Sequence, residues 1–427
     1  MTPTPSGSAG HVAIIGAGVV GAMCALRSLE AGLRVTLIDA GTPGAEQAAS
    51  YGNAGWLSSH SILPPAGPGL WKRVPKLLAD PLGPLTIRWP YLPRAMPWLL
   101  RYLAAGWTLE RVAATARALR TLLVDAPKLH AQAAREAGCG HLVRHEGLLH
   151  VYLSRTAFDK EAAAWRIRAG NGIAWDELHE AELRRREPDL HARYTFAVHV
   201  REAGHCTDPG AYVAALVAHA RANGAELIEE KATGFRIEGG RLRAVRLVSR
   251  REVGCDHAVI AAGARSAALA REAGDKVPLD TERGYHAWVS AHEAGPRTPM
   301  SVSDCSIVAT PIGDGLRVAG QVEIAGLAAA PNWRRAQLLR EQLQGVFPSL
   351  ARGLPADRVR YWMGHRPSMA DGLPCIGPAR GCADVIHAFG HGHTGLVGAA
   401  RTGRVVAQLL TGARPEIELD AFSPQRF

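Results

Sequence analysis

Three glycines near the start of the chain have the spacing of a phosphate-binding turn. Gly16, Gly18 and Gly21 form the pattern Gly-x-Gly-x-x-Gly. In such a turn the first glycine permits a tight bend, the second lets a pyrophosphate approach the backbone, and the third lets a helix pack closely on a strand. Asp39 follows about 20 residues later, where a carboxylate accepts hydrogen bonds from an adenosine ribose. These residues predict a dinucleotide site, but they do not by themselves distinguish FAD from NAD.

The segments around these glycines have the composition of the elements that such a site needs. Residues 11–15 are apolar and rich in β-branched side chains, as in a buried strand, residues 22–31 have helical composition, and residues 34–39 repeat the strand pattern. The alternation then stops, and a loop of small residues follows at 48–55. Helix and strand patterns of the first kind return only at 208–263. A nucleotide domain completed by distant sequence is typical of FAD proteins with an inserted substrate domain.

Other catalytic and metal-binding patterns are absent from the sequence. The chain has no Gly-x-Ser-x-Gly elbow, no His-Glu-x-x-His pair and no P-loop lysine. The seven cysteines include no Cys-x-x-Cys pair, and His391 with His393 lacks the further ligands that a metal site requires. We therefore expect no metal.

The composition of the 427 residues, 47% hydrophobic and 21% charged, is that of a globular protein. The net charge of +10 comes from basic residues spread along the chain, so nucleic acid is not an expected partner. Scattered cysteines of odd number suit a reducing compartment. Residues 1–10 lack the features of an export signal, and the most apolar run, residues 12–26, is shorter than the ~20 residues that cross a bilayer. The sequence thus predicts a cytoplasmic protein.

Six further segments occur in the order in which a known family carries them. They are Ser50–Gly55, Gly204–Pro209, residues 256–266, Glu282–His286, Gly364–Gly377 and Gly390–Leu396. With the glycine turn they resemble the FAD-dependent D-amino-acid dehydrogenases, within the wider family that holds glycine oxidase, sarcosine oxidase and D-amino-acid oxidase. The resemblance runs nearly end to end. It implies an α/β fold in which a Rossmann-like FAD-binding domain is interleaved with an α+β substrate domain built on a mixed sheet.

The resemblance also implies where substrate and flavin bind. The arginine of the family's Gly-x-Arg-Pro turn clamps the substrate carboxylate, which gives that role to Arg366, and its planar fork matches a carboxylate as lysine cannot. Tyr285 is either a second donor to that carboxylate or a packed core aromatic. Tyr51 either borders the active site or anchors its loop. His391 and His393 lie in the loop that covers the flavin, where either could sense or stabilise reduced flavin; for His393 a water-exposed loop position is favoured.

We expect the FAD to be bound non-covalently, because no cysteine or histidine motif for flavin linkage is recognisable. The glycine turn and the resemblance together assign its contacts to residues along the whole chain. These are Gly16, Gly18, Val19, Val20, Gly21, Asp39, Ser50, Asn53, Ala54, Gly55, Ala262, Gly263, Gly390, Gly392, His393, Thr394, Gly395 and Leu396.

The order of the motifs predicts a discontinuous division of the chain. The FAD-binding domain takes residues 10–60, 188–273 and 359–427, and the substrate-binding domain takes residues 61–187 and 274–358. We expect the mixed sheet of the substrate domain to pack over the flavin.

Two patterns inside the substrate domain predict local structure. Residues 109–137 have a helical pattern, and Asp314 with Gly315 between apolar runs predicts a β-hairpin. The stretch from 71 to 107 contains four tryptophans interspersed with Arg and Lys, and a helical cap is its favoured interpretation. The alternative is a peripheral membrane face, since amphipathic segments of Trp, Leu and Arg lie well at lipid interfaces. Such a face would lie at the inner side of the cell membrane, where a quinone chain accepts electrons.

The predicted function is that of an FAD-dependent D-amino-acid dehydrogenase. The resemblance implies that a hydride passes from the substrate Cα to flavin N5, that the imine hydrolyses in water, and that the electrons go to a quinone or another respiratory acceptor instead of oxygen. The Arg-Pro-Ser turn favours a substrate of D-proline or D-hydroxyproline type. Two alternatives stay open: an oxygen-using oxidase of glycine, sarcosine or another amine, and a non-catalytic FAD-binding subunit that is structural or relays electrons.

Overall fold

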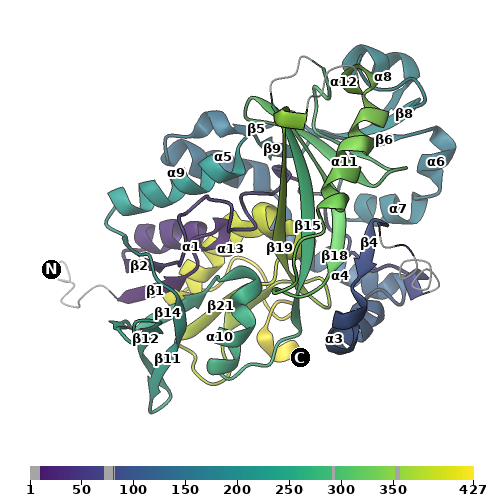
Figure 1. The fold of residues 1–427 in the computed structure, drawn as a ribbon. Coiled ribbons are helices and arrows are strands. Elements are labelled where there is room, and N and C mark those ends of the chain that lie inside the picture. Colours follow the sequence, from purple (N-terminus) through teal and green to yellow (C-terminus); the bar gives the residue numbers. More distant parts are fainter. Residues whose placement is uncertain (1–9, 72–79, 81, 291–293, 352–355) are drawn as a thin grey trace.

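The computed structural model describes residues 10–71, 80, 82–290, 294–351 and 356–427 (Figure 1). Two large sheets dominate this part of the chain, one of six strands and one of nine. Figure 1 shows the six-stranded sheet and its helices, in purple, teal and yellow, beside the long green strands of the second sheet.

The six-stranded sheet has the order β10-β2-β1-β14-β21-β20. Its ladders are parallel except for the last pair, β20 with β21. Strands covered on both faces read as continuous apolar runs, which explains the composition at 11–15. The strands are β10 (Glu226–Ile228), β2 (Arg34–Ile38), β1 (His11–Ile15), β14 (His257–Ile260), β21 (Val385–Phe389) and β20 (Cys375–Pro378).

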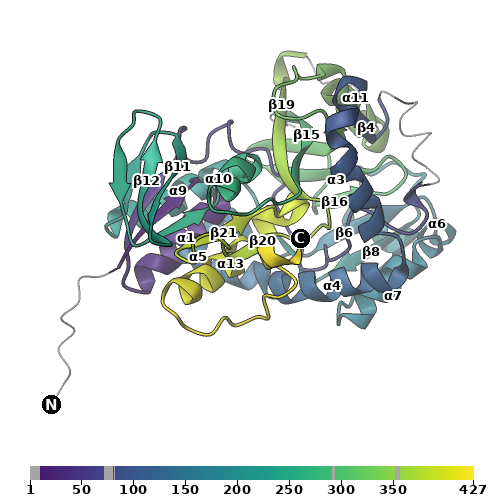
Figure 2. The same ribbon diagram turned by 90° about the horizontal axis from the view of Figure 1, so that it is seen from below.

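Alternate residues of β1 enter two different layers, as the pleat of a strand requires. Val12 and Ile14 pack in one apolar cluster with helices α1 (Val19–Glu30), α9 (Pro209–Ala222) and α13 (Gly395–Leu410). Ala13 and Ile15 pack in another with a three-stranded sheet and helix α10 on the opposite face. That face is formed by β11 (Ala232–Glu238), β12 (Arg241–Leu247), β13 (Glu252–Gly254) and α10 (Ser266–Glu272). Figure 1 shows α1 and α9 above β1 and β14, with β11, β12 and α10 below them, and Figure 2 looks at the molecule from below, the side of β11, β12 and α10.

The nine-stranded sheet has the order β19-β15-β18-β17-β16-β6-β8-β7, with β4 pairing parallel to β18. Helix α11 (Trp333–Val346) packs against its long strands in an apolar cluster. The strands are β19 (Val359–Met369), β15 (Leu279–Ser290), β18 (Gly315–Ile324), β17 (Ile307–Ile312), β16 (Met300–Val302), β6 (Leu148–Tyr152), β8 (Phe196–Val200), β7 (Asp176–His179) and β4 (Leu85–Ile87).

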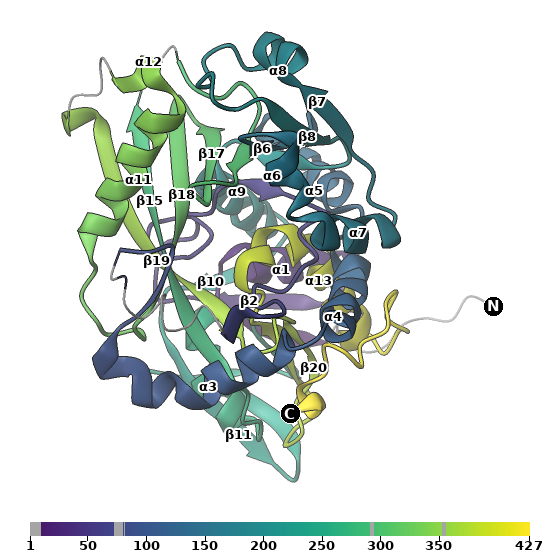
Figure 3. The ribbon, with the colours of Figure 1, turned by 90° about the vertical axis from the view of Figure 1, so that its right-hand side faces the viewer.

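The remaining elements surround these sheets, and Figure 3 shows helices α3 and α4 along one side. A small sheet contains β3 (Trp56–Leu57), β9 (Gly204–Cys206) and β5 (Val143–Arg144). The other helices are α3 (Leu92–Ala105), α4 (Leu109–Leu123), α5 (Ala126–Glu136), α6 (Arg155–Asp159), α7 (Ala162–Gly170), α8 (Glu180–Arg186) and α12 (Pro348–Ala351). Short 3₁₀ turns are η1 (Trp89–Tyr91), η2 (Gly140–Leu142), η3 (Gly263–Arg265), η4 (Ala356–Arg358), η5 (Gly392–Thr394) and η6 (Pro424–Arg426).

The mixed fold and the hairpin predicted from the sequence are confirmed. Strands β17 and β18 pair antiparallel across the turn at 313–314, where Gly313 has a φ of +62°. The helical pattern of 109–137 corresponds to two helices, α4 and α5. They are separated at Asp125, whose φ of 62° lies in the left-handed region that a helix interior excludes.

The six-stranded sheet combines strands from the beginning, the middle and the end of the chain, as expected of a discontinuous domain. Two strands depart from the predicted boundaries, since β8 and β19 fall in the FAD-domain blocks but pair in the nine-stranded sheet. The reason is that a strand pattern does not encode which sheet a strand joins. The domain boundaries themselves stay a prediction. Among the described residues, no helix combines the length and the apolarity needed to cross a bilayer.

Candidate active site

The glycine turn brings three backbone segments closer than any side chain would allow. A Cβ on Gly16, whose φ is +108°, would lie 2.4 Å from the carbonyl oxygen of Ala261 at the end of β14. A Cβ on Gly21 would lie 1.8 Å from the carbonyl oxygen of Gly16. Helix α1 begins at Val19, immediately after this turn. Its first N–H groups have no partner within the helix and carry the positive end of the helix dipole, which suits them to a pyrophosphate.

Asp39 and Ser50, from two other segments, accept hydrogen bonds from backbone N–H groups of the turn. The carboxylate of Asp39 accepts hydrogen bonds from the backbone N–H groups of Ala17, at 2.7 Å, and Gly41, at 2.9 Å. The Ser50 hydroxyl accepts one from the N–H of Val19 at 3.1 Å. Both side chains also line the cavity beside the turn. A ligand placed at this turn therefore meets a carboxylate and a hydroxyl that the fold already holds in position.

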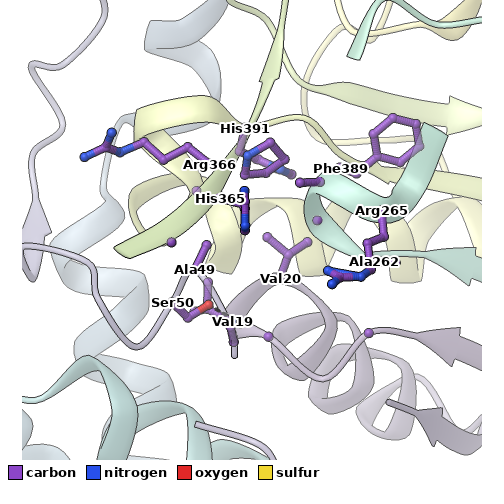
Figure 4. Close-up of a pocket in the computed structure, with 18 of the residues that line it drawn as sticks. Val19, Val20, Ala49, Ser50, Ala262, Arg265, His365, Arg366, Phe389 and His391 are labelled. Atoms are coloured by element: carbon purple, nitrogen blue, oxygen red, sulfur yellow. Dashed lines mark hydrogen bonds between the residues drawn. The ribbon is translucent and has the colours of Figure 1, made fainter. Parts of the chain in front are cut away.

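One cavity of about 1560 Å³ extends from this turn to the nine-stranded sheet. Its lining includes Gly18 and Asp39 from the six-stranded side and Val308, Val322 and Arg366 from the nine-stranded side. Figure 4 shows His365, Arg366 and His391 on the side of the cavity opposite Val19 and Ser50. Pockets for drug-sized ligands measure about 300–1,000 Å³. The volume, the helix terminus and the glycine cradle fit an elongated dinucleotide such as FAD with room for a small substrate.

Fourteen of the residues assigned to FAD from the sequence line this cavity. They are Gly16, Gly18, Val19, Val20, Asp39, Ser50, Asn53, Ala54, Ala262, Gly263, Gly392, His393, Gly395 and Leu396. The other four do not line the cavity but contact neighbouring backbone or side chains. Gly21 packs against Gly16, a Cβ on Gly55 would meet the carbonyl of Cys206 at 2.3 Å, a Cβ on Gly390 would meet Met369 at 2.4 Å, and the Thr394 hydroxyl donates to the carbonyl of His391.

Three residues of the nine-stranded sheet hold the segment 46–53 against the cavity. None of them was assigned a role at the site from the sequence alone. The Arg317 guanidinium donates to the carbonyls of Tyr51, at 2.9 Å, and Asn53, at 2.5 Å. Its burial lowers its pKa to about 10. The Trp362 indole donates to the carbonyl of Glu46 at 2.9 Å, and the His286 ring lies 3.2 Å from the carbonyl of Gly52. The loop is thus tied to the second sheet through its backbone.

Tyr51 does not line the cavity. Its hydroxyl donates to Glu46 at 3.3 Å, and its ring lies against Trp362 with 6.1 Å between the centroids. This geometry corresponds to the loop-anchoring alternative for Tyr51.

Two glycines leave the space that the side chains of Arg366 and Trp362 occupy. Gly284 of β15 and Gly364 of β19 face each other across the antiparallel ladder. A Cβ on Gly284 would lie 2.4 Å from Cζ of Arg366, and a Cβ on Gly364 would lie 1.9 Å from the ring of Trp362. The pleat places Trp362, Gly364 and Arg366 on one face of β19. Sequence alternation around the Gly-x-Arg motif could have identified Trp362 as a neighbour of Arg366.

The side chain of Arg366 is half-buried at the cavity wall, and its guanidinium is incompletely paired. Its Nη1 makes no hydrogen bond within the described residues. Burial lowers the pKa of Arg366, and the charge of Glu282 acts in the opposite direction. An unsatisfied buried cation of this shape is costly to the fold unless a ligand pairs with it, and a carboxylate pairs with it in bidentate fashion. The arrangement can therefore bind a small carboxylate at the cavity wall.

The hydroxyl of Tyr285 is already engaged. It donates to the Glu323 carboxylate at 2.6 Å and accepts from the N–H of Asn332 at 3.0 Å. Glu323 is further paired with Arg88 at 2.7 Å and Arg283 at 3.2 Å. Tyr285 lines the cavity, but its donor is turned to this buried network, which corresponds to the core-aromatic alternative. Its contact with a substrate carboxylate stays a prediction.

His391 is held as a neutral ring. The Thr402 hydroxyl gives its single proton to the carbonyl of Gly398, so the His391 Nε2 at 3.0 Å from that hydroxyl must be the donor. Burial lowers the pKa of His391 to about 4. A neutral imidazole whose Nε2 is committed in this way leaves Nδ1 as its lone-pair nitrogen.

His393 and His365 complete the titratable groups near Arg366. His393 is 41% accessible, and it lines the cavity. His365 also lines the cavity, lies 3.2 Å from the Thr281 hydroxyl, and has a pKa lowered to about 4 by burial and by Arg283 and Arg265. Within the described residues no group of three or more His, Cys, Asp and Glu side chains could hold a metal ion.

Comparison with known proteins identifies close relatives. The model of the DAO family, described as FAD dependent oxidoreductase, matches residues 11–409. A protein of Bradyrhizobium diazoefficiens named D-amino-acid oxidase is 59% identical over 98% of this chain and 99% of its own length. A Methylobacterium protein named D-amino acid dehydrogenase is 30% identical over 98% and 99%. Among solved structures, glycine oxidase from Geobacillus kaustophilus has a TM-score of 0.73 at 21% identity, covering 98% of this chain and 99% of that one, and shares the fold.

We expect Gly21→Ala to weaken FAD binding at least about tenfold, equivalent to about 1.4 kcal/mol. The added methyl would lie 1.8 Å from the Gly16 carbonyl and would displace the turn from the helix. The ratio of flavin to protein absorbance after dialysis measures the effect. Gly345→Ala in α11 is the control, because no atom lies within 4 Å of its Cβ position. Equal flavin retention in both variants would contradict the role of the turn.

Proposed function

The chain belongs to the DAO family of FAD-dependent oxidoreductases, and on this basis we propose that it oxidises D-amino acids to 2-oxo acids and ammonia, or a D-proline-type substrate to a cyclic imine. The observation that carries the proposal is the guanidinium of Arg366, which lies at the cavity wall with a buried and unpaired Nη1. A carboxylate is the ligand that this group fits. The names of the relatives at 59% and 30% identity, D-amino-acid oxidase and D-amino acid dehydrogenase, support an amino acid of D configuration as the carboxylate.

The residues of the chain supply binding and orientation. Bound FAD supplies the two-electron acceptor for the oxidation. We propose that the glycine turn, Asp39 and Ser50 hold its nucleotide half and that residues 390–396 lie against its other end. Arg366 would then fix the substrate by its carboxylate and leave the Cα and the amine facing the cavity. Gly284 keeps the space that the guanidinium occupies.

The lining around Arg366 favours substrates with an uncharged side chain. Val308, Val322 and Leu327 are apolar lining residues of the same cavity, from the nine-stranded sheet and the segment after it. Among the described lining residues the carboxylates are Asp39 and Glu230, both at the six-stranded sheet. A basic substrate side chain would therefore find no carboxylate among the described lining residues of the nine-stranded sheet. These walls support a substrate of D-proline or D-hydroxyproline type.

Two classes of electron acceptor are candidates for the reoxidation of the flavin. Transfer to a quinone or another respiratory acceptor is the first. Transfer to oxygen is the second, and it is favoured by the name of the relative at 59% identity, D-amino-acid oxidase. A glycine- or sarcosine-type oxidase is the alternative for the substrate.

We expect D-amino acids, and not their L-enantiomers, to bleach the flavin under anaerobic conditions. D-proline, D-hydroxyproline and D-alanine would act faster than D-arginine, because the cavity lining at the nine-stranded sheet presents no carboxylate to a second cation. Stopped-flow absorbance measures the rate, and the recolouring rate in air against that with a soluble quinone distinguishes the two acceptors. Bleaching by glycine or sarcosine alone would replace the proposal with the amine-oxidase alternative.

Arg366→Lys should lower kcat/KM for D-amino acids about 10- to 100-fold, since a charged hydrogen bond contributes about 1.5–3 kcal/mol and lysine cannot form the bidentate pair. The FAD content should not change. Arg360→Lys, on the exposed end of the same strand, is the matched control. Unaltered kcat/KM in the Arg366 variant would remove the carboxylate clamp from the mechanism.

We also propose that helix α3 forms a peripheral contact with a membrane, where a quinone would accept electrons. One face of α3 packs against the molecule through Ala95, Trp98 and Tyr102, as a helical cap would. Its outer side carries exposed apolar side chains: Leu100 is 60% exposed, and Trp89 just before it is 63% exposed. Figure 2 shows α3 at the outer surface. Residues 72–79 and 81 of the tryptophan-rich stretch lie outside the described residues.

Arginines flank this apolar surface, which suits an anionic lipid interface. Arg94 and Arg101 are exposed on α3 itself. Trp107, which is 58% exposed, extends the surface beyond the helix and stacks on Trp71 at 6.2 Å between the ring centroids.

Replacing Trp89 and Leu100 together by alanine should lower binding to anionic lipid vesicles at least about tenfold, because each fully buried apolar side chain contributes about 1.5–3 kcal/mol. Co-sedimentation with vesicles that contain phosphatidylglycerol measures the partition. Val248→Ala, an equally exposed apolar residue on the β12–β13 turn, is the control. The membrane proposal fails if the wild-type protein does not sediment with the vesicles.

A further inference from the structure

A buried carboxylate beside Arg366 has no role in the function proposed so far. Glu282 lies on β15 directly opposite Arg366 in the antiparallel register, and it is 2% exposed. Its Oε1 accepts a hydrogen bond from the Ser368 hydroxyl at 3.1 Å. Its Oε2 is buried and makes no hydrogen bond within the described residues. A half-satisfied buried carboxylate destabilises a fold, so its presence at a candidate active site points to a use there.

The nearest titratable side chain to the free oxygen is His393. The ring Nδ1 lies 3.4 Å from Oε2 of Glu282. His393 belongs to η5, in the loop between β21 and α13. His391, two residues earlier, forms an antiparallel β-bridge with Ser368 on β19. The loop and the two strands therefore fix the imidazole and the carboxylate relative to each other.

The accessible surface of His393 opens into the cavity. His393 and Arg366 are both among the lining residues, while Glu282 lies behind the lining. Because Nδ1 is turned to Glu282, Nε2 is on the opposite edge of the ring. The pair thus consists of an inner carboxylate and an outer imidazole that a bound substrate can reach.

Charged groups from each neighbouring element act on this pair. Burial lowers the pKa of His393, Glu282 of β15 raises it, and Arg366 of β19 lowers it. Behind Glu282, the pKa values of Tyr102 of α3 and Asp280 of β15 are raised by burial, with Glu282 contributing in the same direction. The neutral form of the His393 ring is the form that can accept a proton.

We propose that His393 is the base that takes the ammonium proton of the bound amino acid and that Glu282 positions it. The inference rests on the proposed function. With the carboxylate on Arg366, the α-nitrogen is two bonds from the carboxyl carbon and lies in the part of the cavity that His393 lines. An amino acid at neutral pH carries an ammonium group, and its nitrogen has no lone pair with which to form a double bond to Cα.

One N–H bond of the ammonium breaks, its electron pair stays on nitrogen, and the proton binds Nε2 of His393. The nitrogen lone pair would then form the C=N bond as the Cα hydrogen leaves with its two electrons, for which FAD, when bound, would supply the acceptor. Water would hydrolyse the iminium of a primary amine such as D-alanine to the 2-oxo acid and ammonium, whereas D-proline would give a cyclic imine that keeps its nitrogen. The His393 imidazolium, stabilised by Glu282, returns its proton to water before the next turnover.

The test is the pH dependence of anaerobic flavin reduction by D-proline and D-alanine at subsaturating concentration. In the wild-type protein the rate should be nearly constant around neutral pH and fall only below the pKa of His393. In His393→Gln it should fall about 10²- to 10⁴-fold at pH 7, the range of general-base catalysis. As the pH is raised, the rate of the variant should increase about tenfold per pH unit, because the fraction of substrate with a neutral amine increases by that factor. The rate should approach that of the wild type at a pH where the free amine is neutral.

Glu282→Gln provides the second variant, and it keeps the shape of the side chain. Removing the negative charge that stabilises the imidazolium should shift the low-pH fall of the rate to lower pH. His141→Gln, an exposed histidine far from these elements in the sequence, is the control for histidine replacement. Binding of propanoate, which has no amine, should be nearly unchanged in His393→Gln and shows that Arg366 and the fold are intact.

The outcomes separate the two claims. A His393→Gln variant whose rate is lowered by the same factor at every pH, or not lowered, would overturn the role of His393 while leaving the proposed function in place. An unshifted pH profile in Glu282→Gln would overturn the role of Glu282. Wild-type protein that no D-amino acid reduces would overturn the proposed function and this inference together.

Discussion

The incompletely paired guanidinium of Arg366, half-buried at the cavity wall, is the group around which the rest of the site is arranged. A cation removed from water without a partner is unfavourable, so the surrounding structure must supply stability from elsewhere. It does so through the antiparallel pairing of β15 and β19, which is continuous from Leu279 to Val289. Gly284 leaves the space that the guanidinium fills. The opposite charge of Glu282 is held one strand away, close enough to act on Arg366 but not aligned for a direct pair.

At the other end of the cavity, glycines again leave space that the site needs. Missing Cβ atoms at Gly16 and Gly21 let β1, α1 and the end of β14 converge, so the first turn of α1 can approach a phosphate. Between the two ends, Arg317 and Trp362 reach from the second sheet to the backbone of the loop at 46–53. The two sheets are therefore joined through the segment that would lie along a bound dinucleotide, and the cavity between them has walls from both.

Local patterns were sufficient to predict the elements and the features that depend on near neighbours in sequence. The glycine turn, the strand of residues 11–15, the hairpin at Asp314 and the FAD-dependent family itself follow from such patterns. The sheet assignment of β8 and β19 could not be predicted, because both edges of a strand look the same in sequence. The helix break at Asp125 depends on a single left-handed residue that the helical pattern does not reveal.

The site was predictable as a list of segments but not as a set of contacts. The hydroxyl of Tyr285 turns to Glu323, and that pairing depends on residues 38 positions apart. Glu282 acquires its importance from His393 and Ser368, which the fold brings to it from the end of the chain. Such pairings arise from the register of β15 with β19 and from the loop before α13, and no spacing within one segment encodes them.

The most direct measurement of the central claim is a comparison of two ligands of nearly equal shape at the cavity wall. Titration of the FAD-loaded protein with propanoate and with propanamide, followed by the change in the flavin absorbance spectrum, isolates the charge that Arg366 is expected to bind. Propanoate should perturb the spectrum saturably and bind at least about tenfold more tightly than propanamide, as expected for a charge-assisted pair. Equal binding of the two ligands, or binding of the amide alone, would contradict a carboxylate clamp at Arg366.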